Sequence, residues 1–323
     1  MNTVLGEKYV AGVAVEATRG TYVAAQDFIR TREPATVQTE VEKVDIAETE
    51  GSGFANKGQV VTMKRVAGEA AVNMRYRTYG YWLKSLFGGC TSAVESGETA
   101  VYRHSFSIDV ANPQPSLSLS LARGTFDHKK INGAVVRQIS ETYSLDDVVN
   151  ANVSLMARAE ETVSDITPAF TNDDYLAPHQ SVTVKIADDV AGLAAATPIC
   201  VTEMTNEMNR NTREKLCLSS TSVQDHIAQL MNLTGSFTWD KTADTYQAFD
   251  QANSEHALEI SIVNTAVDIG EASNPTLVYT FPKVTLSTEE SRPLDDIVTE
   301  TVSWTAQSVT ASLVNEKDNY DAA

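Results

Sequence analysis

Residues 66–89 read VAGEAAVNMRYRTYGYWLKSLFGG, in which a short glycine-containing strand runs into a helix signal. The apolar positions of this helix follow the i, i+3, i+4, i+7, i+8 spacing of one buried face. They are Tyr79, Trp82, Leu83, Leu86 and Phe87. Thr78 can cap the start of the helix, and Gly88-Gly89 can end it. The stretch therefore predicts a strand followed by a short helix from Thr78 to Phe87, packed on a core by one face.

Most other segments alternate apolar and polar residues, which is the pattern of a half-buried strand. Clear examples are Val13-Ala14-Val15-Glu16, Ser116 to Leu121, Val182 to Ile186 and Leu258 to Ile262. With 42% apolar residues, the chain can also bury a substantial core. The sequence thus predicts a mainly β protein with few helices.

The pattern around the first helix recurs later in the chain. Gly68 and Tyr79 are matched by Gly235 and Tyr246 at one offset of 167 residues, and Phe249 follows Tyr246 as Trp82 follows Tyr79. Strands that contain His104 and His256 come after the two helix signals, and the ending Asn152 to Met156 is similar to Thr310 to Asn315. We interpret this as a duplication into domains 1–165 and 166–323, each with one short flanking helix, joined by a polar linker from Ala159 to Asp174.

The net charge of −18 argues against DNA or an anionic membrane as an adhesive partner, because binding phosphate needs Lys and Arg. It is compatible with DNA as a passing neighbour. Residues 1–165 carry 17 basic and 20 acidic side chains, and residues 166–323 carry 8 and 23, so the second half dominates the charge. We expect no signal peptide and no membrane-spanning segment, since no run of about 20 apolar residues occurs.

A search for reactive groups gives no candidate catalytic, cofactor-binding or metal-binding residues. The three cysteines show no CxxC spacing, and the five histidines lack ligand spacing. Carboxylate pairs such as Asp146-Asp147 and Asp295-Asp296 leave an acid/base or calcium role open, but they lack the alternating positions of a calcium loop. We interpret them as an acidic surface and expect no enzyme activity and no cofactor.

The stretch 66–89 resembles phage tail tube proteins of long, non-contractile tails, in which a glycine-led strand precedes a helix ending in Leu-x-x-Leu-Phe/Leu-Gly. Residues 101–106 and the ending Val309 to Asn315, with Tyr320 after it, are similar to the same family. The resemblance implies a β-sandwich or partial barrel with one helix on its flank, and sheets of neighbouring subunits that join and line a channel. Six such domains usually make a ring, so two domains per chain imply a trimeric, pseudo-hexameric ring.

The resemblance also implies the partners and the location in the virion tail. These partners are other copies of the chain, a tape-measure protein, and the tail terminator and distal tail proteins. The glycine-rich loop from Ala47 to Gly58 is a candidate for contacts between stacked rings, with Phe54 as its anchor. Its candidate contact residues are Glu50, Gly51, Gly53, Phe54, Asn56 and Lys57.

Three other functions stay open at the level of sequence. Another β-rich virion part, a tail terminator or a capsid decoration protein, would share the composition. A carbohydrate-binding adhesin would need exposed aromatic side chains, for which Trp239 and Trp304 are the available indoles. An enzyme would need a reactive constellation that the sequence does not contain.

Overall fold

Strands dominate the computed structural model, as the alternation of apolar and polar residues predicts. The structure describes residues 8–47, 58–110, 114–124, 127–163, 165–293 and 297–322. The first half contains β1 (Tyr9–Val15), β2 (Asp27–Ile29), β3 (Gln38–Asp45), β4 (Gln59–Asn73), α1 (Tyr79–Phe87), β5 (Gly88–Val94), β6 (Tyr102–Ile108), β7 (Leu117–Arg123), β8 (Asp127–Ser144), β9 (Asn150–Ala157) and β10 (Ala159–Val163). The second half contains two short 3₁₀ turns, His179–Ser181 and Ala191–Ala194, together with β11 (Val182–Ala187), β12 (Val201–Asn209), β13 (Arg213–Lys215), β14 (Asp225–Ile227), β15 (Asn232–Asp240), α2 (Thr245–Ala252), β16 (His256–Val263), β17 (Thr276–Ser291), β18 (Thr299–Ala306) and β19 (Thr310–Asn315).

Eight strands form one continuous antiparallel sheet, here called the front sheet. Their order is β3–β4–β9–β8–β12–β15–β18–β17, so four strands come from each half of the chain. The two halves meet where β8 pairs with β12, with Glu203 opposite Ser144 and Asn209 opposite Gln138. We call this β8–β12 pairing the inner seam.

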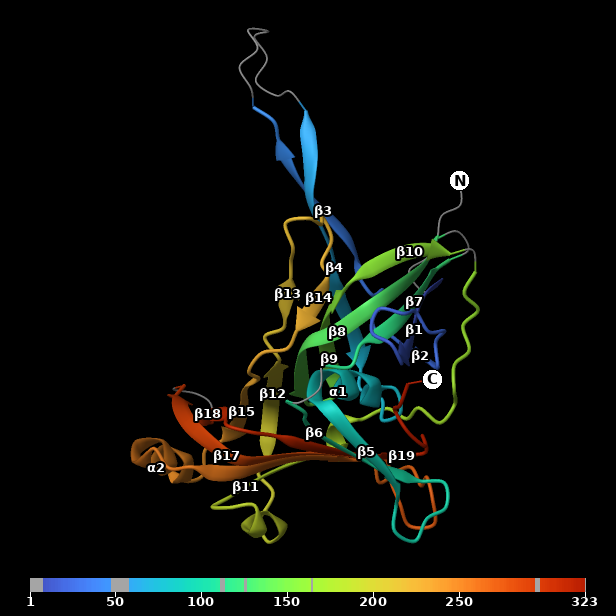
Figure 1. The fold of residues 1–323 in the computed structure, drawn as a ribbon. Helices are drawn as coiled ribbons and strands as arrows, with labels where there is room; N and C mark the ends of the chain where they lie inside the picture. Colours follow the sequence, from blue (N-terminus) through green and yellow to red (C-terminus); the bar gives the residue numbers. More distant parts are fainter. Residues whose placement is uncertain are drawn as a thin grey trace.

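Two smaller sheets pack behind the front sheet. One has the order β2–β1–β7–β8–β10, and the other has the order β11–β16–β17–β19–β6–β5. The long strands β8 and β17 each belong to a smaller sheet with their first part and to the front sheet with their second part (Figure 1). This confirms the predicted mainly β sandwich, and the sheets do not close into a barrel.

The strand pairing of the first half recurs in the second. The pairs β1–β7, β7–β8, β8–β9, β9–β4, β4–β3 and β8–β10 have the counterparts β11–β16, β16–β17, β17–β18, β18–β15, β15–β12 and β17–β19. Gly68 and Gly235 hold the same place in this pattern, and both allow a close approach. A Cβ on Gly68 would lie 2.6 Å from the Val37 backbone, and one on Gly235 would lie 2.3 Å from the Trp304 ring.

Three details of the expected repeat differ from the pairing. The strand with His104 is β6, which pairs with β19, so the counterpart of the His256 strand is β7. The counterpart of Asn152 to Met156 is β18, whereas Thr310 to Asn315 corresponds to β10. The expected linker begins with β10 itself. The β5–β6 hairpin accounts for the first mismatch, because it adds a strand after α1 and joins the sheet of the second half, whereas among the described residues α2 is followed directly by β16.

The predicted helix forms as α1 and is almost wholly buried. Gly88 ends it with a φ of 92°, a conformation that favours glycine. The expected side-chain cap by Thr78 is not made. Asp174 caps the helix instead, because its carboxylate accepts hydrogen bonds from the Thr78 and Arg77 backbone N–H groups and from the Thr78 hydroxyl.

The two helices pack differently. All five predicted face residues of α1 are buried, including Trp82, and they belong to a single core that extends across both halves. Helix α2 buries only Tyr246, whose ring packs edge-on against Phe237 and Trp239. Phe249 is partly buried and stacks on His256 at 3.8 Å between ring centres. The second helix thus lies at the margin of the fold, beside β17.

Candidate assembly surface

One face of the front sheet carries polar side chains on all eight strands, with Ala67, Ala71 and Met156 interspersed among them. The register of the pairs places alternate residues of each strand on this face, while the residues between them, such as Val153, Met208 and Val302, are buried in the core. Around the inner seam the face is lined by small polar side chains. A shallow hollow of about 480 Å³ has among its lining residues Ser140, Thr142, Thr205, Glu207, Thr234, Ser236, Ser303 and Thr305.

The charge on this polar face is strongly negative. As far as the bulge after Glu42 in β3, the acidic residues on this face are Glu40, Glu42, Glu69, Glu203, Glu207, Asp240 and Glu289. Among the described residues of that face the basic side chain is Arg65, and its charge is paired with Glu42 and with Glu214 at 2.8 Å. A face with this charge repels phosphate electrostatically.

Behind the inner seam lies a buried carboxylate, Glu141, which is 1% exposed. Its four hydrogen-bond donors come from different elements: the hydroxyls of Tyr79 on α1, Tyr143 on β8 and Tyr279 on β17, and the amide of Asn206 on β12. The distances are 2.6 Å from Tyr143, 2.6 Å from Tyr279 and 2.7 Å from Asn206. Burial raises the pKa of Glu141, and the four donors oppose that rise. The cluster therefore ties the two halves together at their junction.

The two outermost strands of the front sheet each keep one side without a strand partner. In the described part of the chain, β3 pairs with β4 alone, and residues 285–291 of β17 pair with β18 alone. The exposure pattern agrees, since every residue of β3 is exposed. Free strand edges are templates for pairing with another chain, so these two edges are candidate sites for association.

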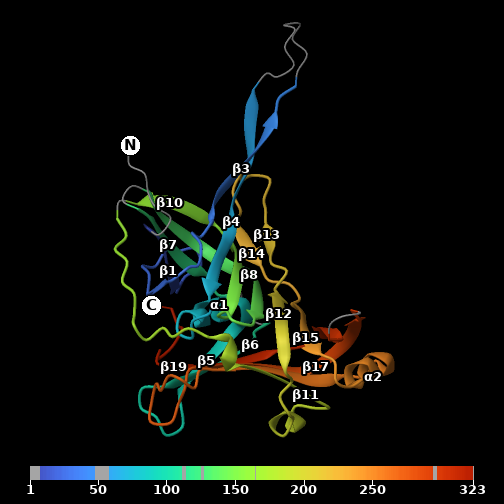
Figure 2. The same cartoon turned by 180° about the vertical axis from the view of Figure 1, so that it is seen from behind.

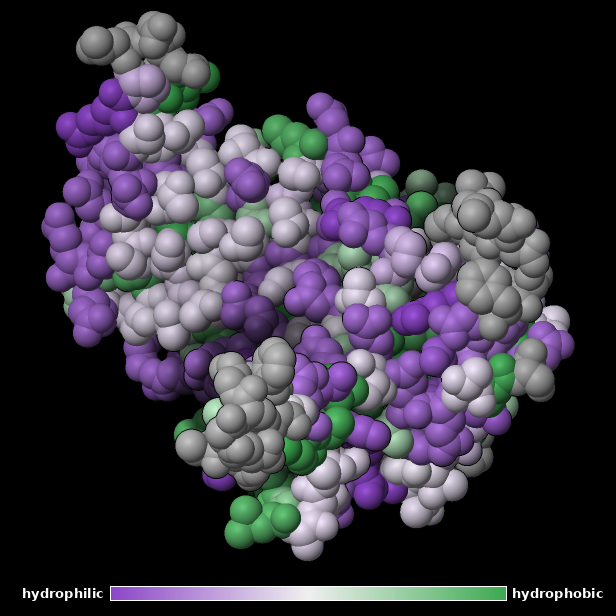
Figure 3. All heavy atoms as spheres, turned by 90° about the horizontal axis from the view of Figure 1, so that it is seen from above, coloured by the Kyte–Doolittle hydropathy of each residue, from purple (hydrophilic) through white to green (hydrophobic). Residues whose placement is uncertain are grey.

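Two hairpins extend in the same direction from the body of the molecule. The described parts of β3 and β4 project beyond the other strands, and β13 and β14 lie beside them (Figure 1; Figure 2). The second hairpin contacts the first through a bond from the Lys64 N–H to the Thr221 carbonyl at 2.6 Å. Seen from this end, the surface is mostly polar, with apolar residues scattered among polar ones (Figure 3).

Exposed apolar side chains nevertheless accompany the second hairpin. Leu218 is fully exposed, Leu230 is 87% exposed, and Leu216 and Ile227 are also exposed. A groove of about 1750 Å³ runs along the base of this hairpin, with Arg210 among its lining residues. This region was not among the predicted contact sites, although Leu216-Cys217-Leu218 directly after the charged run 213–215 is a visible signal. The expected contact residues Glu50, Gly51, Gly53, Phe54, Asn56 and Lys57 lie outside the described residues.

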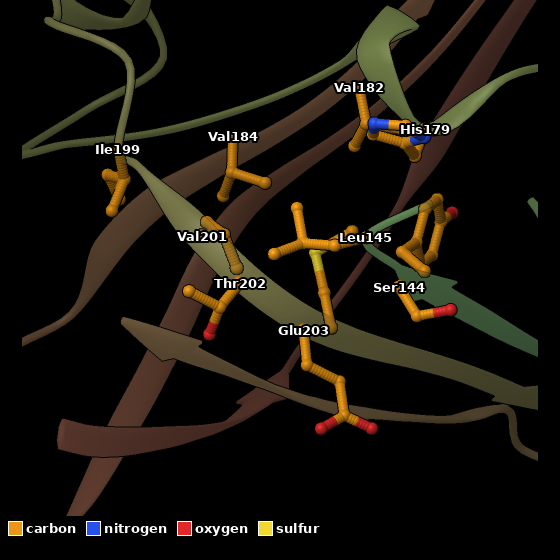
Figure 4. A pocket seen from close by; sticks show the side chains of 11 residues that line it. Ser144, Leu145, His179, Val182, Val184, Ile199, Val201, Thr202 and Glu203 are labelled. Atoms are coloured by element: carbon orange, nitrogen blue, oxygen red, sulfur yellow. The ribbon is translucent and has the colours of Figure 1, made fainter. Parts of the chain in front are cut away.

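A small cavity lies between the two halves at the end of the inner seam. Its volume is about 70 Å³, and its walls come from the end of β8, from β11 and from the start of β12 (Figure 4). Val182, Val184 and Val201 give it an apolar lining, with His179 at its rim (Figure 4). Ligand pockets usually measure about 300–1000 Å³, so this cavity is too small for a typical ligand, and we interpret it as a packing defect.

The described residues contain no group of three or more His, Cys, Asp or Glu side chains placed to hold a metal ion. Cys90 is partly buried, and Cys200 and Cys217 are exposed free thiols. No helix in the described ranges is long and apolar enough to cross a membrane. Trp239 and Trp304 are buried, and Trp239 donates to Glu300 at 3.0 Å, so neither indole presents an exposed face to a sugar.

Comparison with known proteins gives one family. The family described as phage tail tube protein matches residues 6–306, which is nearly the whole chain. No curated protein matches the sequence.

Proposed function

The chain belongs to the phage tail tube protein family, and from this we propose that it assembles into stacked rings that form the tube through which the genome leaves the virion. It is a structural protein of the virion tail. The front sheet is the observation that carries the proposal. It combines an acidic polar face with two free strand edges, so copies joined edge to edge would enclose an acidic channel.

We further propose that each half of the chain is one tube domain and that three chains make a ring. The recurring strand pairing supports two equivalent domains, 1–165 and 166–323, and each supplies four strands to the front sheet. Head-to-tail contacts between identical chains close into a ring when the rotation between copies divides a full turn evenly. Three chains would supply six domains with pseudo-sixfold symmetry.

The partners follow from the role as a tube. DNA would pass the acidic face without sticking, and the growing tube would enclose a tape-measure protein and end at terminator and distal tail proteins. The proposal assigns the protein no cofactor and no catalytic step. Contacts between rings would come from the projecting hairpins. We keep the segment around Phe54 as one candidate and add the exposed Leu218 of the second hairpin as another.

Electron microscopy of the purified chain tests the proposal. Rings and tubes with a hollow centre are expected, and class averages should show three chains and six similar domains per ring. A single ring that never stacks would instead indicate a terminator, and particles that remain single chains at high concentration would contradict the proposal. Leu218→Asp should shorten the tubes while leaving the rings intact, because it places a charge at an apolar axial contact.

A further inference from the structure

The inner seam shows how two of these domains join. Strand β12 lies antiparallel to β8, with Met208 opposite Ile139 and Asn209 opposite Gln138. The Arg210 N–H donates to the Arg137 carbonyl at 2.8 Å, so the N–H groups of even-numbered residues in β12 point toward β8. The first domain thus offers one side of β8, and the second domain offers the outer side of β12.

The recurring pairing identifies the equivalent edges that stay free. Val37 is placed opposite Gly68 as Asn206 is opposite Gly235, so β3 takes the place of β12. Ser154 is opposite Gln138 as Ser303 is opposite Ser287, so the second part of β17 takes the place of β8. Transferring the register of the inner seam then sets Thr39 opposite Thr288 and Glu40 opposite Ser287.

The backbone directions agree with this register. The Thr36 N–H donates to the Glu69 carbonyl on β4 at 2.9 Å, so the N–H groups of odd-numbered residues near it in β3, including Thr39, point to the free side. The Gln307 N–H donates to the Lys283 carbonyl at 3.0 Å, so even-numbered residues of β17, including Thr288, direct their N–H groups to its free side. Thr39 and Thr288 are therefore able to form a pair that exchanges two backbone hydrogen bonds.

Both of these N–H groups are covered by a carboxylate in the single chain. Glu160 on β10 accepts the Thr39 N–H and the Thr39 hydroxyl on the same oxygen. Asp250 on α2 accepts the Thr288 N–H at 2.9 Å and the Thr288 hydroxyl at 3.1 Å, again on one oxygen. Strand β10 and helix α2 thus each place a carboxylate on one threonine, and the proposed register sets these two threonines, Thr39 and Thr288, opposite each other.

We propose that β3 of one chain pairs antiparallel with β17 of a neighbouring copy, with Thr39 opposite Thr288, and that Glu160 and Asp250 cap these edges until pairing displaces them. This inference rests on the proposed function. Side chains that cover an edge are a known defence against uncontrolled strand pairing. Helix α2 lies beside the free edge of β17, but this does not prevent pairing there. At the inner seam, α1 contacts β8 in the same way, and β12 still pairs with β8.

The caps are local and reversible. Burial tends to raise the pKa of Glu160, but hydrogen bonds from Thr39 and Lys129 outweigh it, so the pKa lies below its usual value and the cap is a carboxylate. When the edges meet, each threonine N–H exchanges a carboxylate for a backbone carbonyl, and both carboxylates return to water. Assembly would therefore be slowed by the cost of breaking four charge-assisted bonds, two at each carboxylate, without being blocked.

A disulfide between copies tests the register. Glu40 and Ser287 are exposed, and in the proposed seam they form a pair without mutual backbone bonds, with Cα atoms about 4.5 Å apart. Within one chain they lie at opposite ends of the eight-stranded sheet. Glu40→Cys/Ser287→Cys, made in a background with Cys200 and Cys217 replaced by serine, should cross-link chains in assembled rings. Full oxidation should end at a closed species of three chains.

The matched control is Glu40→Cys/Ser291→Cys, which uses the same face four residues further along β17. It should cross-link at least tenfold less. Tubes that form without the first disulfide, or with equal cross-linking in the control, would overturn the seam and leave the proposed function standing. Failure of all variants and of the wild type to form rings would overturn both.

Assembly kinetics test the caps. Glu160→Ala and Asp250→Ala should each lower the protein concentration at which tubes form by roughly tenfold, which is about 1.4 kcal/mol per contact. Glu161→Ala, an exposed neighbour with the same change in charge, should leave it unchanged. Thermal unfolding of the single chain is the second readout. A lower melting temperature with unchanged assembly would show that the carboxylates only support their own domain and would overturn their role as caps.

Discussion

In the recurring strand pairing, the outer strands β3 and β17 take the places that β12 and β8 have at the inner seam, so the two regions can be compared. At the inner seam, β8 and β12 are paired, and Glu141 lies behind them with four hydrogen-bond donors. At the outer edges, β3 and β17 have no partner strand within the described chain, and the counterpart of Glu141 is Glu290, which instead pairs with Lys241 and Arg292 near the surface. If each half is one tube domain, as proposed, a second copy would have to supply at the outer edges the backbone pairing that the chain itself supplies at the inner seam.

The largest expected effect is at Glu141. Glu141→Ala leaves three buried tyrosine hydroxyls and the Asn206 amide without their acceptor, so the free energy of unfolding should fall by about 3–5 kcal/mol. Glu290→Ala, the equivalent change at the outer edge, should leave the unfolding midpoint of the single chain close to that of the wild type. Chemical denaturation of both variants measures the contrast. Equal losses of unfolding free energy in the two variants would contradict the difference predicted between the paired inner seam and the unpaired outer edge.

Proline substitutions sharpen the comparison at the level of the backbone. Met208 and Thr39 hold the same place in the two halves, and the N–H of each points away from its own domain. Met208→Pro removes a backbone hydrogen bond of the inner seam and leaves its acceptor without a donor, so the free energy of unfolding should fall by about 1–3 kcal/mol. Thr39→Pro leaves the bonds between β3 and β4 intact, so the chain should stay folded but fail to form rings. Circular dichroism and electron microscopy of the two variants separate these outcomes, and rings formed by Thr39→Pro would contradict the role of β3.

The sequence was sufficient for the helix and for most strands. The spacing from Tyr79 to Phe87 encodes a local period, and the alternation in β11 and β16 marks one buried face, so both could be predicted without tertiary information. The same alternation predicts the strands β1 and β7, but both faces of these strands are buried, because the polar Glu16, Ser118 and Ser120 lie inside the fold. Gly68 and Gly235, which lie at the same distance from Tyr79 and Tyr246 in the sequence, also take the same place in the strand pairing, where each allows a close approach. The duplication itself stays a prediction.

The features that could not be predicted from the sequence depend on contacts between segments that are distant in the chain. The cap of α1 comes from Asp174, almost a hundred residues beyond Thr78, so local capping rules could not find it. The donors around Glu141 come from four elements of both halves, and no local pattern marks that glutamate among the many acids of the chain. The same holds for Glu160 and Asp250, which acquire a role only because β10 and α2 lie beside the outer strands.

The next effect in size is a pH dependence at the inner seam. Because the folded state raises the pKa of Glu141, its contribution to stability is fully present below the ordinary value of 4.5 and is lost as the pH rises through the folded pKa. The stability advantage of the wild type over Glu141→Gln should therefore be larger at pH 5 than at pH 8, and both differences should be smaller than the loss in Glu141→Ala. Urea denaturation at the two pH values measures it. An advantage that grows with pH would indicate a lowered pKa and a charged Glu141.

The smallest effect concerns the polar face. The inner seam and the proposed β3–β17 pairing, here called the outer seam, each place one glutamate at the corresponding position on this face. At the inner seam Glu207 is opposite Ser140, and in the proposed outer seam Glu289 is opposite Gln38. If both seams line one channel, Glu207→Lys and Glu289→Lys should increase the retention of short duplex DNA in assembled tubes to a similar, modest extent. The retention should weaken with salt, because each new phosphate contact releases about 0.9 counterion. Filter binding with tubes at low and moderate salt measures it, with Glu161→Lys as a control on β10. Retention by the Glu207 variant but not by the Glu289 variant would show that the outer edge does not complete the wall that the inner seam begins.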